Sequence, residues 1–173
     1  MKTKFLIITL LFFSFRVESQ ITDNINWKSF SLVNINPKLN YNILLGINKK
    51  NIIGQLGKPQ RIIHLYWKTL TEDVDEYIYG ENIFYIDVAK SNLWGFVIKN
   101  STFSLKYKDR DYSIGMSIEN LKLSFPNSCK HKKENYITVN LLTDKGELSE
   151  GYLYFKYNSN NRITEIGFTA DVD

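Results

Sequence analysis

Hydrophobic and polar residues alternate along many short stretches of this chain, which is the pattern of strands that bury one face. In residues 136–142, Ile137, Val139 and Leu141 alternate with polar or tyrosine neighbours. Short turn sequences separate several stretches, among them a hairpin turn with Gly80 at its first central position. Successive strands joined by short turns indicate antiparallel pairing. We expect strands at 61–67, 74–79, 82–88, 92–98, 102–107, 136–142, 151–157 and 162–169.

Two further segments, 45–59 and 114–126, break this alternation and resemble each other at an offset of 69 residues. Asn48 and Ser117 fall at equivalent positions, and both are residue types that cap helix N-termini well. Apolar residues flank each cap at the spacing of a hydrophobic staple. These staple pairs are Ile47 with Ile52 and Met116 with Leu121. The sequence therefore predicts two short helices that place an apolar stripe against a sheet.

Together these elements predict an α+β fold, in which an antiparallel β-meander sheet has two short helices packed on one face. The likeness of the two helical segments favours an internal duplication over chance similarity. The expected organisation is a signal peptide (1–19), an N-terminal extension (20–44) and two related helix-plus-meander units (45–110 and 111–173) that pack as one domain.

The repeated motif is an apolar residue, Gly, any residue and Ser or Asn, then a short helix that ends in Leu-Gly-Lys-Pro or Phe-Pro before a β-meander. It resembles the small outer-membrane-assembly lipoproteins of the SmpA/OmlA type and the secreted β-lactamase inhibitor proteins. The resemblance covers residues 45–169 and implies the fold and a binding role. This chain lacks the lipid-anchor cysteine of the first family and the disulfides of the second, so no binding residue is carried over.

The N-terminus has the layout of a secretory signal peptide. Lysines precede an apolar stretch at 5–15, and Val17 and Ser19 stand at the −3 and −1 positions before Gln20. The stretch is shorter than the ~20 residues that a membrane span needs. We expect a secreted or periplasmic protein with no membrane span after cleavage; the alternative is an uncleaved anchor.

Charge and cysteine content exclude several classes of protein. The formal net charge is +4, and residues 1–19 carry three of the positive charges and one of the negative charges, so their removal leaves +2. A nucleic-acid-binding domain would show a basic stripe, so no nucleic-acid partner is expected. The single cysteine, Cys129, excludes an internal disulfide.

No catalytic residue, metal site or cofactor is predicted. Cys129 and His131 could supply two metal ligands, but zinc sites use three or four. His64 is expected to be a packed or edge-strand histidine. The acidic run at 72–76 is interpreted as a solvated turn between strands, with a paired-carboxylate hydrolase site as the alternative.

Tyrosines provide the candidate binding surface. Alternation places Tyr152 and Tyr154 on the face opposite Leu153 and Phe155, and the Leu/Phe face is the natural choice for the core. Tyrosine is enriched in binding patches, although tyrosine pairs also stabilise sheets. The binding candidates are Tyr77, Tyr79, Tyr136, Tyr152 and Tyr154.

The preferred function is a secreted or periplasmic, non-enzymatic binding protein whose open sheet face meets a protein or another envelope component. Two alternatives remain open. One is a small secreted hydrolase with an unrecognised site, and the other is a structural factor of the envelope with no discrete ligand.

Overall fold

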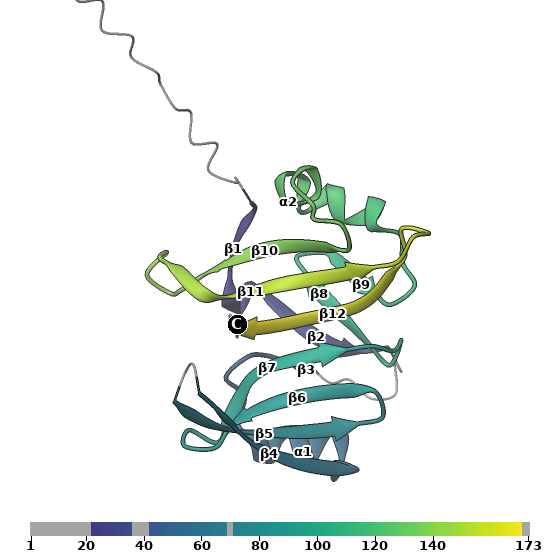
Figure 1. The fold of residues 1–173 in the computed structure, drawn as a ribbon. Helices are drawn as coiled ribbons and strands as arrows, with labels where there is room; N and C mark the ends of the chain where they lie inside the picture. The colour runs from purple at the N-terminus through teal and green to yellow at the C-terminus, as the bar shows by residue number, and fades with distance from the viewer. Residues whose placement is uncertain (1–21, 36–41, 69–70, 171–173) are drawn as a thin grey trace, which may run out of the picture.

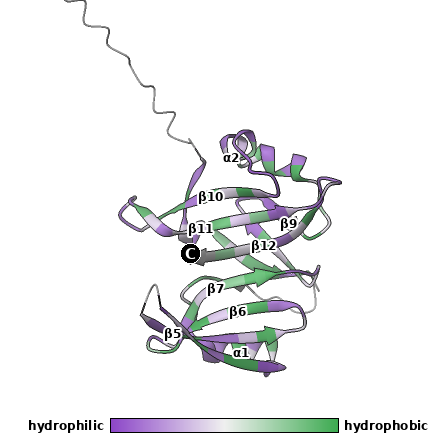
Figure 2. Ribbon diagram, viewed as in Figure 1, coloured by the Kyte–Doolittle hydropathy of each residue, from purple (hydrophilic) through white to green (hydrophobic). Residues whose placement is uncertain are grey.

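Two β-sheets pack against each other, with short helices at their ends, in a computed structural model that describes residues 22–35, 42–68 and 71–170 (Figure 1). The predicted signal peptide lies outside the described residues. The alternation of hydropathy along the strands is visible in Figure 2. The helical elements are η1 (Trp27–Ser29), α1 (Lys49–Leu56), η2 (Ile118–Leu123) and α2 (Pro126–Lys130).

The larger sheet has eight strands in the order β1-β10-β11-β12-β7-β6-β5-β4. Their bounds are β1 Asn24–Asn26, β10 Tyr136–Leu142, β11 Leu148–Tyr157, β12 Ile163–Ala170, β7 Asn92–Ile98, β6 Asn82–Asp87, β5 Glu72–Tyr79 and β4 Arg61–Trp67. The smaller sheet has the order β3-β2-β8-β9, with β3 Asn42–Ile43, β2 Phe30–Asn34, β8 Phe103–Tyr107 and β9 Arg110–Ser113. All pairs are antiparallel except β1 with β10.

Strands β7 and β12 join two meanders into the larger sheet. The meander β4–β7 lies on one side of this junction, and the meander β10–β12 lies on the other. The last strands of the two meanders, β7 and β12, therefore lie side by side near the centre of the larger sheet. Their register pairs Ile98 with Ile166, Val97 with Gly167 and Phe96 with Phe168.

Helices α1 and η2 begin in the same way. Gly46 and Gly115 have φ angles of 78° and 86°, a region that favours glycine. Their N–H groups donate to the carbonyls of Leu93 and Ile163, both at 2.8 Å, which ties each helix start to the last strand of its meander. The cap side chains accept from the residue two positions on, Asn48 from Lys50 N–H and Ser117 from Glu119 N–H.

Aromatic rings form the core between the sheets. Phe155 of β11 and Phe125, which precedes α2, have ring centroids 5.7 Å apart, and Tyr112 of β9 lies 6.0 Å from Phe155. Closer to α1, Phe84 of β6 meets Phe103 of β8 at 5.7 Å. All of these residues are buried, so both sheets contribute to one hydrophobic cluster.

The eight predicted strands are confirmed, as are the antiparallel meander and the hairpin at Gly80, where Tyr79 pairs with Asn82. Three details differ. The extension at 20–44 contributes three strands, β1, β2 and β3. Residues 102–107 form β8 of the smaller sheet, not part of the main meander. Pro126, predicted to end a helix, occupies the first turn of α2, where its missing N–H costs nothing.

We expect Phe155→Ala to lower the free energy of unfolding by about 3–5 kcal/mol, because it removes a ring packed on two other aromatic rings in the core. Leu123→Ala on η2 is the control; Leu123 is exposed, so its loss should change stability by less than about 0.5 kcal/mol. Urea denaturation of both variants measures this. Equal stability losses would contradict the assignment of Phe155 to the core.

Candidate functional site

One face of the larger sheet carries six aromatic side chains and faces away from the smaller sheet. The register places Tyr85, Gly95, Val97, Gly167 and Tyr154 on this side, opposite the core residues of the same strands. Figure 1 views this face, with α1 and the smaller sheet behind it. We call this surface the aromatic face and define it by Trp67, Tyr85, Trp94, Tyr136, Tyr152 and Tyr154.

Tyr154 of β11 lies flat across the neighbouring strand β12. A Cβ built on Gly167 would come within 2.3 Å of the Tyr154 ring, so only glycine leaves room for it. The Tyr154 hydroxyl donates to the Glu165 carboxylate at 2.8 Å. Burial, and then this hydrogen bond to a carboxylate, raise the pKa of Tyr154 far above its usual value. Only 9% of the Tyr154 surface is exposed, so its ring forms the buried base of the aromatic face.

Tyr136 and Tyr152 stand on either side of Tyr154. Their ring centroids lie 6.0 Å and 6.2 Å from that of Tyr154. Tyr136 is 36% exposed, and the ammonium group of Lys156 lies 5.6 Å from its ring centroid. Together with Lys133 the three tyrosines line a depression of about 370 Å³. This part of the face offers rigid amphipathic rings beside cationic groups.

Trp67, Tyr85 and Trp94 form the other part of the aromatic face. The Trp67 ring lies 5.3 Å from Tyr85 and 5.0 Å from Trp94. Burial, and then the charges of Glu76 and Glu165, raise the pKa of Tyr85 to about 12. All three rings are half-buried, so they cover the sheet while leaving edges exposed.

Glu165 lies between the two aromatic groups. Its carboxylate accepts the Tyr154 hydrogen bond, and its other oxygen is 3.6 Å from the Lys99 ammonium group. Because the charge of Glu165 also acts on Tyr85, this carboxylate connects Tyr154 of β11 with Tyr85 of β6. The face thus combines aromatic area with a partly buried negative group at its centre.

A cleft of about 500 Å³ adjoins the aromatic face at Trp94. Its walls come from η1, the β6–β7 turn and the β10–β11 hairpin. Buried Asp87 lies in this wall. Burial alone would raise the pKa of Asp87, but hydrogen bonds from the backbone and ammonium group of Lys90 outweigh it and lower the pKa.

Tyr77 and Tyr79 do not belong to the aromatic face, so their predicted orientation is wrong. Tyr77 is 5% exposed and belongs to the hydrophobic core. The Tyr79 hydroxyl donates to the Gly57 carbonyl at the end of α1, and its ring packs on Phe84. Alternation alone equally allows Val74 and Ile78, on the opposite face of this strand, to be the core positions. Tyr77 pairs with Phe84, however, and both lie on the α1 side.

Trp67, Tyr85 and Trp94 were not predicted as site residues. The alternation of Phe84 and Ile86 within 82–88 contained the signal for Tyr85, since it places that ring opposite the core. Trp94 was harder to assign, because the β6–β7 ladder has an irregularity next to it that shifts the alternation.

His64 of β4 lies beside two carboxylates of β5. Its Nδ1 is 2.9 Å from Asp75 and its Nε2 is 3.5 Å from Asp73. The hydrogen bond with Asp75 is the main cause of a raised pKa for His64. The side chain is 61% exposed, so this is a surface ion pair and no enclosed catalytic site. The acidic run at 72–76 begins β5, and its predicted placement in a turn is wrong.

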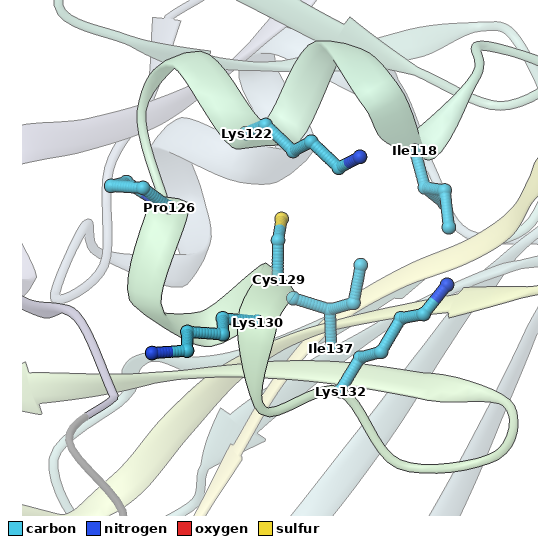
Figure 3. A pocket seen from close by; sticks show the side chains of 7 residues that line it. All are labelled: Ile118, Lys122, Pro126, Cys129, Lys130, Lys132 and Ile137. Atoms are coloured by element: carbon cyan, nitrogen blue, oxygen red, sulfur yellow. The ribbon is translucent and has the colours of Figure 1, made fainter.

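Cys129 lines a pocket of about 370 Å³ beneath η2 (Figure 3). Its sulfur points into the pocket, where Lys122 and Lys132 extend over the opening while Lys130 points away. Burial raises the pKa of Cys129 to about 11, and the charge of Asp23 adds to this effect. The thiol is therefore protonated at neutral pH and unsuited to nucleophilic catalysis.

Within the described residues, no group of three or more His, Cys, Asp or Glu side chains is placed to hold a metal ion. None of the helices in the described ranges has both the length and the apolar character needed to cross a membrane. The chain matches no protein-family model, no curated protein and no solved structure.

The contact between Gly167 and Tyr154 predicts a coupled pair. Gly167→Ala should lower the free energy of unfolding by about 2 kcal/mol through overpacking. In a Tyr154→Ala background the same change should cost at least ~1 kcal/mol less. Gly54→Ala in α1 is the control, since no atom lies near its added methyl group. A double-mutant cycle by urea denaturation measures the coupling, and additive effects would contradict the contact.

Raised tyrosine pKa values predict a loss of stability in alkali. The unfolded chain releases its phenolic protons near pH ~10, whereas the folded chain holds that of Tyr85 until about 12. The folded state therefore binds more protons above pH ~10, and the free energy of unfolding falls as the pH rises. Tyr85→Phe should make this decline shallower between those pH values. Denaturation series at each pH measure it, and parallel profiles would contradict the assignment.

Proposed function

We propose that this protein is a secreted or periplasmic, non-enzymatic binding protein that engages a protein or another envelope component through its aromatic face. The observation that carries the proposal is the gathering of six aromatic side chains on a sheet face that no described element covers. The solvent-facing members, Tyr136 and Tyr152, are the proposed contact anchors. Tyr154, largely buried, is proposed to support them.

The chemistry of this face supports binding. Tyrosine and tryptophan supply large, rigid contact area at a small cost in side-chain entropy. The rings are already fixed by packing on each other, so a partner would meet a preorganised surface. Lys156 and Lys99 add positive charge around it. Such aromatic patches with polar surroundings are typical of protein interfaces.

We also propose that residues 45–110 and 111–173 are two copies of one helix-plus-meander unit. The shared geometry of the helix starts at Gly46 and Gly115 supports this. Further support comes from Ser91 and Asn161, which both have a φ of 55° and accept a hydrogen bond from the first residue of the helix. The arrangement fits the resemblance to inhibitors and assembly lipoproteins.

The alternative of a hydrolase has less support. His64 and Asp73 are exposed, and Asp75 is half-buried. His131 follows α2, which lies against β10 at the other end of the sheet. Cys129 holds its proton at neutral pH. An envelope structural factor without a discrete ligand would not need the preorganised rings of the aromatic face.

The proposal is tested by capture of envelope components with the purified protein, followed by an affinity measurement with the captured component. Replacing both Tyr136 and Tyr152 by Ala should weaken binding at least about tenfold, because such rings act as hot spots. The melting temperature should stay near that of the original protein, since both rings are partly exposed.

The matched control is Leu123→Ala, which removes an exposed hydrophobic side chain on η2, away from the aromatic face. It should leave the affinity unchanged. If the tyrosine variant binds as well as the control, the aromatic face is structural and the proposed function loses its support.

A further inference from the structure

Strand β4 is an unusually open edge. It forms one end of the larger sheet, and no strand of the described residues pairs with its outer side (Figure 1). The other edge strands, β1, β3 and β9, have three, two and four residues, whereas β4 has seven. Proteins normally shorten or protect such edges, because unpaired backbone groups pair readily with another strand.

Strand β4 has few of the usual protective devices, and its one permanently charged residue, Arg61, stands at its end. The strand reads Arg-Ile-Ile-His-Leu-Tyr-Trp, with no lysine and no proline, and its pairing with β5 is continuous without a bulge. Ile62 and Tyr66 are 52% and 58% exposed. Long, apolar and regular, this edge has the features of a docking site for an extended strand.

The sequence of β4 is nearly symmetric about His64, with two apolar residues directly on each side of it. An antiparallel copy centred on His64 places Ile62 opposite Tyr66 of the second copy, and Ile63 opposite its Leu65. At the ends, Arg61 meets Trp67 of the second copy, a favourable cation–π pair. Every cross-strand pair away from the centre is thus complementary.

The surroundings of β4 leave room for this arrangement. Ile62 and Tyr66 lie on the same face as Tyr77, the side that α1 covers at the neighbouring strands. Both side chains are more than half exposed, so α1 leaves most of their surface uncovered. His64, at the centre, is turned toward Asp73 and Asp75 of its own chain, so carboxylates offset its charge.

We propose that the protein self-associates through antiparallel pairing of β4 with β4 of a second copy, on a two-fold axis at His64. Ile62 and Tyr66 of each copy then cover each other, and the two eight-stranded sheets become continuous. A single pair of seven-residue strands is a small interface. The dissociation constant is therefore expected to be on the order of micromolar.

The test compares single charge variants and their mixture by sedimentation over a range of concentrations. Ile62→Glu and Tyr66→Lys should each weaken self-association at least about tenfold, because each places a charge opposite an apolar residue. An equimolar mixture should restore it to within about threefold of the original protein. In that heterodimer the introduced glutamate of one variant lies opposite the introduced lysine of the other, and one Ile–Tyr pair is retained.

Leu148→Glu is the matched control, since Leu148 is an equally exposed hydrophobic residue on β11. It should leave the association unchanged, and circular dichroism should show all variants folded. A protein that stays monomeric at every concentration overturns the proposal. A dimer that the single variants do not weaken also overturns it. So does a mixture in which self-association is not restored, because β4 would then pair in another register or bind a different peptide.

Discussion

The pairing of β7 with β12 is the interaction on which the rest of the structure depends. In the described part of the sheet, three register pairs, from Phe96–Phe168 to Ile98–Ile166, join the strands of the two meanders. Without them each meander would leave one more edge unpaired and one more part of the core open to water. The junction places Phe96, Ile98 and Ile166 in the hydrophobic cluster on one side. On the other side it creates a continuous surface.

That continuous surface depends on two glycines at the junction. A Cβ on Gly95 would come within 2.8 Å of the Phe168 carbonyl and 3.2 Å of Tyr85, and one on Gly167 would overlap Tyr154. The side chains absent from these positions are replaced by rings from the adjacent strands, β6 and β11. The aromatic face is therefore the outer covering of the junction as well as the proposed binding surface, which is why its members differ so much in burial.

The sequence was sufficient for the strands and for the facing of some of their side chains. Alternation within 152–157 is regular and assigns Tyr152 and Tyr154 correctly, because Leu153 and Phe155 are both strongly apolar. In 74–79 both faces carry apolar or aromatic residues, and Tyr77 packs in the core while Val74 is buried on the other side. Hydropathy alone could not decide which face would meet α1. In this strand, packing against the smaller sheet and α1 determines which face joins the core.

The N-terminal strands could not be predicted for a related reason. β1 and β3 are three and two residues long, and β1 pairs with β10, which is distant in sequence. Asn24–Asn26 is polar at two of three positions, and only Ile25 is buried. Such strands are stabilised by the sheet that receives them, so local composition contains little signal.

The geometry of edge pairing bears directly on how the aromatic face would work. Antiparallel pairing about a two-fold axis perpendicular to the sheet keeps corresponding faces on the same side. Two copies joined at β4 would therefore present two aromatic faces in one direction, with Trp67 of each copy at one end of the paired strands. A partner with two equivalent surfaces could then be held at both, and the second contact would form at high effective concentration. A weak edge interaction and a moderate face interaction would together give tight binding, while each remains reversible alone.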